Sequence, residues 1–140
     1  MRTGRLLLCL AMGWASVAQA QEAPQEHPID RALSACIEKD YTTVGMIDCA
    51  NTAYDSWDAE LNKQYRALLA KLSPADAAKL KDAQRKWLAF RDAEFAFIDS
   101  IYAKLEGTMW LPTIVMDKSN IIEERTLQLQ SLSSKADERS

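Results

Sequence analysis

The sequence predicts an all-α protein: a helical bundle of about four helices, with two long central helices and one N-terminal disulfide. Three observations lead to this prediction. Apolar residues recur at steps of three and four along extended segments, which is the period of a helix face packed on a core. No segment shows the alternation that is typical of a strand. Beyond the first twenty residues, Gly45 and Gly107 are the only glycines.

Residues 1–20 are predicted to be a cleaved signal peptide. Arg2 and Arg5 precede an apolar run, and Ala-Gln-Ala at 18–20 has the small-x-small form of a cleavage site. The apolar run is too short for a permanent membrane anchor, and no later segment is long and apolar enough to span a bilayer. We therefore expect a mature protein of about 120 residues, one domain in size, located in the periplasm or secreted.

The charge of the mature chain is moderately acidic. The full sequence has 17 Lys and Arg against 20 Asp and Glu, a net charge of −3. Cleavage would remove Arg2 and Arg5, leaving 15 basic residues against 20 acidic ones and a net charge of −5. Such a surface argues against nucleic acid and anionic lipid as partners and is compatible with a basic protein partner.

Two cysteines remain after cleavage, Cys36 and Cys49, because Cys9 lies within the signal peptide. An even number of cysteines in an exported chain favours a disulfide. The bond would close a loop of about 14 residues and stabilise the fold by about 3 kcal/mol in the chain-entropy model. Two free buried thiols are the alternative. A metal site has less support, because His27 is the only histidine.

Helix signals divide the N-terminal part of the mature chain. Residues 21–28 include two prolines and are expected to form a flexible arm, with His27 in solvent. A short helix is expected over residues 29–39. The turn that follows contains a threonine, Thr42 or Thr43, that can cap the next helix. The two cysteines lie on either side of this turn, as expected in a helical hairpin.

Two long helices are predicted next. Apolar residues over 46–72 keep helical spacing for about seven turns. Ser73 as N-cap and Pro74 in the first turn mark the start of another helix. That helix is expected to run to about residue 106 and to end at Gly107.

A fourth helix is expected between an apolar loop at 108–112 and a frayed tail at 134–140, so that the folded domain spans residues 29–133. Trp110 in the loop is a candidate partner contact, because exposed tryptophans often anchor interfaces. The alternative is that Trp110 folds back over the open end of the bundle.

Three polar residues occupy positions where a helix face should be apolar. Gln84 and Arg91 lie on the apolar stripe of the third helix, and Arg125 lies on the apolar side of the fourth. A guanidinium on a buried face is costly unless a carboxylate or several carbonyl groups receive it. We therefore expect a polar network between the helices that sets their register. The alternative is that Arg91 binds an anionic ligand.

The preceding helix offers partners for this network. Asp58 and Asn62 lie one turn apart beside apolar residues, and Glu60 is close to them in sequence. Our hypothesis is that Asp58 or Glu60 receives Arg91, with Asn62 as a further hydrogen-bonding partner.

Catalytic motifs are absent from the sequence. There is no nucleophile elbow, phosphate-binding glycine loop or histidine pair, and His27 in an arm offers no base for a nucleophile. Carboxylates are plentiful, but they occur among lysines and arginines, which indicates solvated ion pairs. We therefore expect a protein that is not an enzyme and that has no cofactor. A hydrolase with two catalytic carboxylates is the remote alternative.

The sequence resembles the lysozyme-inhibitor domain of the LprI family over about residues 33–132, nearly the whole mature chain. The order and spacing of short motifs carry this resemblance. Its first half is matched by 46–49, Tyr54, 58–62 and Tyr65. Its second half is matched by Leu80, Gln84, Trp87, Phe90, Arg91, Asp92 and Glu94, and its closing helix by Arg125 and Leu129.

The resemblance has one departure. Many members of the family carry a second cysteine pair, with one cysteine just after the Arg-Asp-x-Glu run and one in the last helix. Here Phe95 stands at the first of these positions and no cysteine follows it. Hydrophobic packing must replace the second cross-link.

The resemblance implies an exported helical protein that inhibits lysozyme-type muramidases by stoichiometric binding across the active cleft of the enzyme. Acidic or aromatic side chains would meet a cationic surface. The shared motif residues are expected to form the scaffold. The alternative function is a periplasmic adaptor or immunity-type protein that binds another envelope partner and does not inhibit lysozyme.

Overall fold

The computed structural model describes residues 26–138, so the predicted signal peptide, most of the predicted arm and the last two residues lie outside the described residues. Within 26–138 the chain forms four α-helices, one short 3-10 helix and no strand. The elements are α1 (Pro28–Ile37), α2 (Thr43–Lys71), α3 (Pro74–Tyr102), η1 (Thr108–Trp110) and α4 (Leu111–Asp137). The predicted all-α bundle with one disulfide is confirmed.

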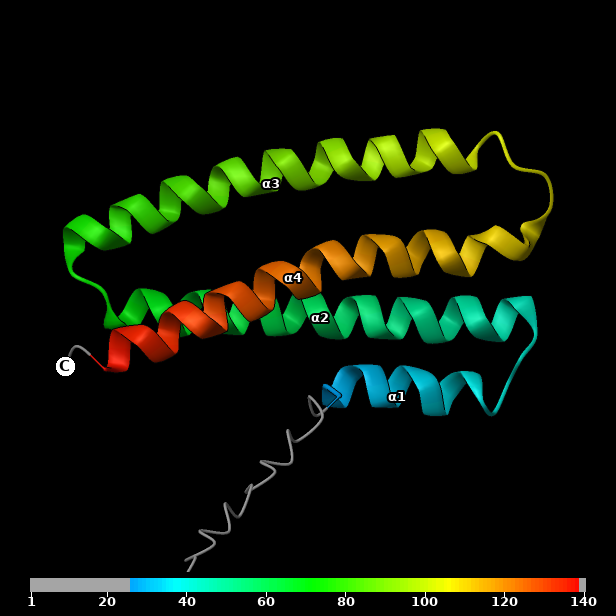
Figure 1. The fold of residues 1–140 in the computed structure, drawn as a ribbon, viewed down its shortest axis with the longest axis horizontal. Helices are drawn as coiled ribbons and strands as arrows, with labels where there is room; N and C mark the ends of the chain where they lie inside the picture. Colours follow the sequence, from blue (N-terminus) through cyan, green and yellow to red (C-terminus); the bar gives the residue numbers. More distant parts are fainter. Residues whose placement is uncertain (1–25, 139–140) are drawn as a thin grey trace, which may run out of the picture.

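The helices form an elongated bundle in which α2 and α4 are the central pair (Figure 1). Most contacts between helices join α2 to α4, whereas α3 packs mainly on α4 and α1 packs on α2. Figure 1 shows α1 and α3 on opposite sides of the central pair. No helix within the described residues is long and apolar enough to cross a bilayer.

The face of α4 that packs on α2 alternates small and large residues. Its buried positions include Ser119, Thr126 and Ser133 at intervals of seven, with Ile122 and Leu129 between them. This is a heptad pattern, in which one position needs small side chains so that two helices can approach closely. The Thr126 hydroxyl donates to the Ile122 carbonyl at 2.8 Å, so its burial leaves no polar group unsatisfied.

The opposing face of α2 supplies the larger side chains of the core. Trp57 is 1% exposed and packs with Leu61 and Leu68 against Ile122 and Leu129 of α4. Of α3, only Leu80 and Gln84 are buried. The core therefore runs along α2 and α4, and α3 joins it mainly through its first half.

The short helix α1 is held to α2 by polar and covalent links, because it has no buried residue of its own. The Cys36–Cys49 disulfide joins the two helices with 5.7 Å between the Cα atoms. At the other end of α1, the Trp57 indole donates to Asp30 Oδ1 at 3.2 Å. These two links fix both ends of α1.

The turn between α1 and α2 follows the predicted capping. The Thr42 hydroxyl accepts from the Gly45 backbone amide at 3.0 Å, so of the two candidate threonines Thr42 is the N-cap. Asp40 accepts from the Thr42 backbone amide, and these contacts with Thr42 lower the pKa of its carboxyl. A side chain at position 45 would overlap the Asp40 carboxyl, so Asp40 would have to move away from its present position.

Both ends of the predicted domain need correction. The arm was expected to include residue 28, but Pro28 begins α1 and His27 is its N-cap, because a proline is well suited to the first helical position. The tail expected from Ser134 is helical to Asp137, where the Asp137 carboxylate pairs with Lys71 of α2 at 2.7 Å.

The sequence prediction also placed the end of α3 too late. The helix stops at Tyr102 instead of continuing to about residue 106. Gly107 has a φ of 88° and precedes η1, so it shapes the entry to the next element and does not cap α3. A glycine after a helix indicates a residue with positive φ. It does not indicate whether that residue ends the helix or belongs to the next element.

The disulfide yields a first prediction. The double substitution Cys36→Ser/Cys49→Ser should lower the free energy of unfolding by about 3 kcal/mol, because the unfolded chain regains the entropy of a closed loop. Urea denaturation followed by circular dichroism measures this loss. Hydrogen exchange should show α1 losing protection while α2 and α4 keep theirs. Equal protection of α1 in both proteins would contradict the role assigned to the bond.

Candidate functional site: an acidic cleft between α2 and α3

Charge is divided unevenly along the bundle. Residues 26–60 and 91–124 carry 15 acidic and five basic residues, whereas 61–90 and 125–138 carry four acidic and nine basic ones. Because α2 and α4 begin where α3 ends, the first two segments share one half of the molecule, on the right in Figure 1. We call this the acidic half, with a formal net charge of −10, and the other the basic half, with +5.

A cleft opens in the acidic half between α2 and α3, with α4 as its floor. It has a volume of about 290 Å³. Its walls and floor are formed by Asn51, Tyr54, Phe95, Ile114, Val115 and Lys118. The lining is mainly apolar and aromatic, and the only cation among these residues, Lys118, pairs with Asp99 at 2.6 Å.

Aspartates gather around Tyr54 in this cleft. Burial raises the pKa of the Tyr54 hydroxyl, and the charges of Asp58, Asp55 and Asp92 raise it further, while Arg91 lowers it. The three aspartates come from α2 and α3, so three carboxylates and the Arg91 guanidinium lie near a cleft whose own lining is mainly apolar and aromatic. This arrangement suits a basic protein surface better than it suits an anion.

The structure does not join Arg91 to Asp58 or Glu60, as the sequence hypothesis proposed. The Arg91 guanidinium pairs with its neighbour Asp92 at 2.6 Å and lies over the rings of Trp87 and Phe95, at 5.7 and 5.6 Å from their centroids. The hypothesis was wrong because α3 packs on α4 and not along α2. Arg91 therefore finds its partners on its own helix.

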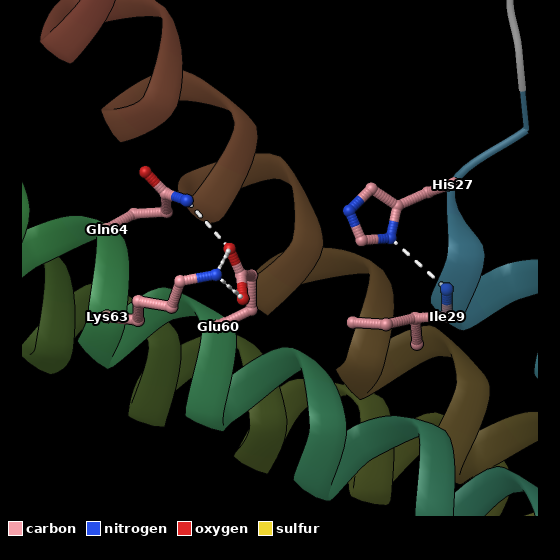
Figure 2. Close-up of polar contacts among 5 residues, drawn as sticks. All are labelled: His27, Ile29, Glu60, Lys63 and Gln64. Carbon is pink, nitrogen blue, oxygen red and sulfur yellow. Dashed lines mark hydrogen bonds and ion pairs between the residues drawn. The ribbon is translucent and has the colours of Figure 1, made fainter.

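The proposed partners on α2 are also satisfied within their own helix. Asn62 Nδ2 donates to the Asp58 backbone carbonyl at 2.8 Å and to Asp58 Oδ2 at 3.1 Å. Glu60 accepts from Gln64 at 2.7 Å and from Lys63 at 3.0 Å, as Figure 2 shows. The hydrogen bond from Gln64 is the main reason why the pKa of Glu60 lies below its usual value.

Gln84 and Arg125 do form a link between helices. Arg125 Nε donates to Gln84 Oε1 at 3.0 Å, joining α4 to the buried stripe of α3. Arg125 also donates to Gln128 and lies 5.9 Å from the centroid of the Trp87 ring. Burial lowers the pKa of Arg125. Since Arg91 contacts the same ring, Trp87 connects the two arginines.

Trp110 is half-buried and lies at the end of the bundle. Its ring centroid is 6.2 Å from that of Tyr102 at the end of α3, and the Tyr102 hydroxyl donates to Asp117 Oδ2 at 2.7 Å. The contact with Tyr102 places Trp110 against the bundle, while its neighbour Met109 is 66% exposed.

His27 is the residue whose position the sequence analysis missed. Its Nδ1 accepts from the Ile29 backbone amide at 3.3 Å, and its ring lies 4.3 Å from that of Trp57. Figure 2 shows the imidazole pointing from α1 toward the side of α2 that carries Glu60. The His-Pro pair was the available signal, because a polar residue before a proline is a typical helix start.

Within residues 26–138, no group of three or more histidine, cysteine or acidic side chains could hold a metal ion. The cleft offers aromatic rings and an apolar floor, and the carboxylates of Asp55, Asp58 and Asp92 lie near Tyr54 at its wall. These groups can bind a cationic and partly apolar surface.

Comparisons with known proteins agree with this description. The sequence model of the lysozyme inhibitor LprI family matches residues 35–129. This chain belongs to that family. An uncharacterised protein of Burkholderia thailandensis has a similar crystal structure, with a TM-score of 0.74 and 25% identity, covering 82% of this chain. The LprI-family chain covers 58% of that protein's length. No curated protein shows significant similarity to the sequence of this chain.

The Gln84–Arg125 bond yields a second prediction. Gln84→Met keeps the volume but removes the acceptor for a half-buried guanidinium, so it should lower the free energy of unfolding by about 1–2 kcal/mol. Gln128→Met removes the exposed partner of the same arginine and serves as the control, with a smaller effect. Urea denaturation of the two variants measures the change in the free energy of unfolding for each. Equal effects would show that the buried bond has no special role.

A third prediction concerns Glu123 of α4. Partial burial raises its pKa, and the nearby charge of Asp30 raises it further, although His27 lowers it. A raised pKa means that folding favours the protonated form of Glu123. The resulting stabilisation is present at low pH and is lost as pH rises through the folded-state pKa. Glu123→Gln should therefore raise the melting temperature by a few degrees at pH 7. The gain should vanish below the ordinary glutamate pKa of 4.5.

The exposed neighbour Glu124 provides the control for this pH series. Glu124→Gln makes the same chemical change one residue away, and we expect a smaller shift in melting temperature at pH 7. A Glu123→Gln variant whose melting temperature equals that of the parent at both pH values would contradict the assignment.

Proposed function

We propose that the mature protein inhibits a lysozyme-type muramidase by binding it in a one-to-one complex. Membership of the LprI family supports this function. The observation that carries the proposal is the acidic half, where 15 acidic residues outnumber five basic ones around an aromatic cleft. We further propose that residues 1–20 direct export, so that the protein acts in the periplasm or outside the cell, where it meets such enzymes.

The charge distribution favours fast association with a basic enzyme. The net charge of the whole mature chain is modest, but an acidic half of −10 creates a directed field that steers a cationic partner to one end of the bundle. This attraction acts over about a Debye length, roughly 8–10 Å at moderate ionic strength, and weakens as salt is added.

The cleft between α2 and α3 provides the short-range contacts. Asp55 on its α2 side is exposed and forms no ion pair within the described residues, so it is available to a lysine or arginine of the enzyme. Tyr54 in the lining supplies aromatic surface, as the centre of a typical interface does, while the ring of Phe95 already lies against Arg91 and Lys118. We propose Trp110, at the same end of the molecule, as a further contact with the enzyme.

The test is a titration of hen-type lysozyme with mature protein that starts at Gln21. The rate of bacterial cell-wall clearing is recorded at low and moderate salt. We expect saturable inhibition near one-to-one, weakened by salt. Asp55→Lys should weaken inhibition by about tenfold, because it places a cation at the mouth of the acidic cleft. Glu138→Lys makes the same charge change in the basic half and should leave inhibition nearly unchanged.

Two results would overturn the proposal. Full lysozyme activity in the presence of excess protein would favour the alternative of another envelope partner, to be sought by affinity capture from periplasmic extract. Loss of cell-wall turbidity without added lysozyme would instead indicate an enzyme that acts on glycan. Equal inhibition by the Asp55 and Glu138 variants would move the binding surface away from the cleft.

A further inference from the structure

We propose that one face of α3 is a self-association surface, on which a second copy of this chain packs its own α3 in the antiparallel direction. We call this face the outer stripe. It consists of residues at helical steps of three and four: Ala83, Lys86, Phe90, Glu94, Phe97 and Ile101.

The outer stripe exposes more apolar surface than a lone helix face should. Phe90 is 54% exposed, Phe97 60% and Ile101 43%. A helix with two aromatic rings and an isoleucine in solvent on one face is typical of an interface, because contiguous exposed apolar patches mark interaction sites. Phe90 also borders a groove of about 670 Å³ between α3 and α4, which leaves room for side chains of a partner.

The charge of α3 changes sign along its length. Residues 74–90 carry four basic and two acidic residues, and 91–102 carry three acidic and one basic. Two parallel copies of α3 would bring like charges together along the whole helix. An antiparallel pair instead places the basic half of each helix opposite the acidic half of the other. This complementarity points to a second copy as the partner.

Charge also selects the register of the pair. When Phe90 lies opposite Phe90 of the partner subunit, Lys86 lies opposite Glu94 of the partner subunit, and the small Ala83 lies opposite the large Phe97 of the partner subunit. A shifted register that pairs Phe90 with Phe97 of the partner subunit would bring the two Glu94 carboxylates together, which is unfavourable. Two-fold symmetry forms each favourable contact twice.

Lys86 can pair with Glu94 of the partner subunit at little cost in free energy. Its Nζ lies 2.8 Å from Asp82 Oδ2, but 75% of the Lys86 side chain is exposed. Such an exposed pair within one helix contributes little to stability, so Lys86 can turn to a carboxylate of the partner.

The outer stripe and the acidic cleft lie on different sides of α3. Phe95 lines the cleft, and Asp99 pairs with Lys118 on the cleft side, whereas Phe90 borders the groove toward the later turns of α4. A dimer formed through the outer stripe therefore leaves both clefts open. This inference does not depend on lysozyme binding.

The test measures the mass of mature protein by sedimentation velocity over a range of concentrations. We expect a monomer–dimer equilibrium. Lys86→Glu and Glu94→Lys should each raise the dimer Kd by about tenfold or more, because each places like charges at two symmetric contacts. An equimolar mixture of the two variants should form a dimer again, because both contacts then pair opposite charges. Lys81→Glu makes the same charge change on an exposed residue off the outer stripe, and it should leave the Kd unchanged.

Thermal melts by circular dichroism confirm that each variant is folded. A monomeric mass at every concentration would overturn the proposal. So would a dimer that both charge variants and Phe90→Asp leave intact. A mixture that fails to recover dimerisation would reject the antiparallel register. If lysozyme, and not a second copy, loses binding in these variants, then the outer stripe belongs to the enzyme contact instead.

Discussion

The close packing of α2 against α4 is the constraint on which the other features of this protein depend. On the face of α4 that packs on α2, Ser119, Thr126 and Ser133 are small. The large ring of Trp57 of α2 is buried between the two helices. The two helices therefore approach over most of their length, and the largest buried side chains all lie between them. Every other helix is positioned relative to this pair.

Because the central pair contains most of the core, α1 and α3 can serve other purposes. A disulfide and a hydrogen bond from Trp57 fix α1. The Gln84–Arg125 hydrogen bond and a few apolar contacts hold α3. Since α3 does not pack along α2, a cleft remains between them. The cleft itself is therefore a consequence of how the helices pack.

Much of the fold could be predicted from sequence because apolar periodicity and capping are local signals. Trp57 and Leu80, which fit the helical spacing of apolar residues, are in the core, and Ser73 and one of the two candidate threonines, Thr42, are N-caps. The α4 seam was harder, since a buried serine or threonine looks polar in a hydropathy pattern. Its seven-residue interval carries the information, because the position requires small side chains, although Ser133 also accepts a hydrogen bond from Lys71 of α2.

The candidate site was less predictable, because it depends on which helices are neighbours. Gln84 and Arg125 were both recognised as unusual, yet nothing local says that they meet each other. Arg91 was assigned a partner on α2 because both residues lie on or beside the apolar stripes of their helices. In the folded protein it bonds to Asp92 and lies on two aromatic rings. His27 was placed in solvent because its ring contact with Trp57 is a tertiary interaction.

The small residues on α4 also affect how such a chain can diverge. Serine, alanine and glycine differ in polarity but are all small, so exchanges among them at a position such as 119 keep the helices equally close. The hydropathy profile of the last helix can therefore drift while its geometry stays the same. Distant relatives would then be recognised more reliably by the spacing of small residues than by apolar character.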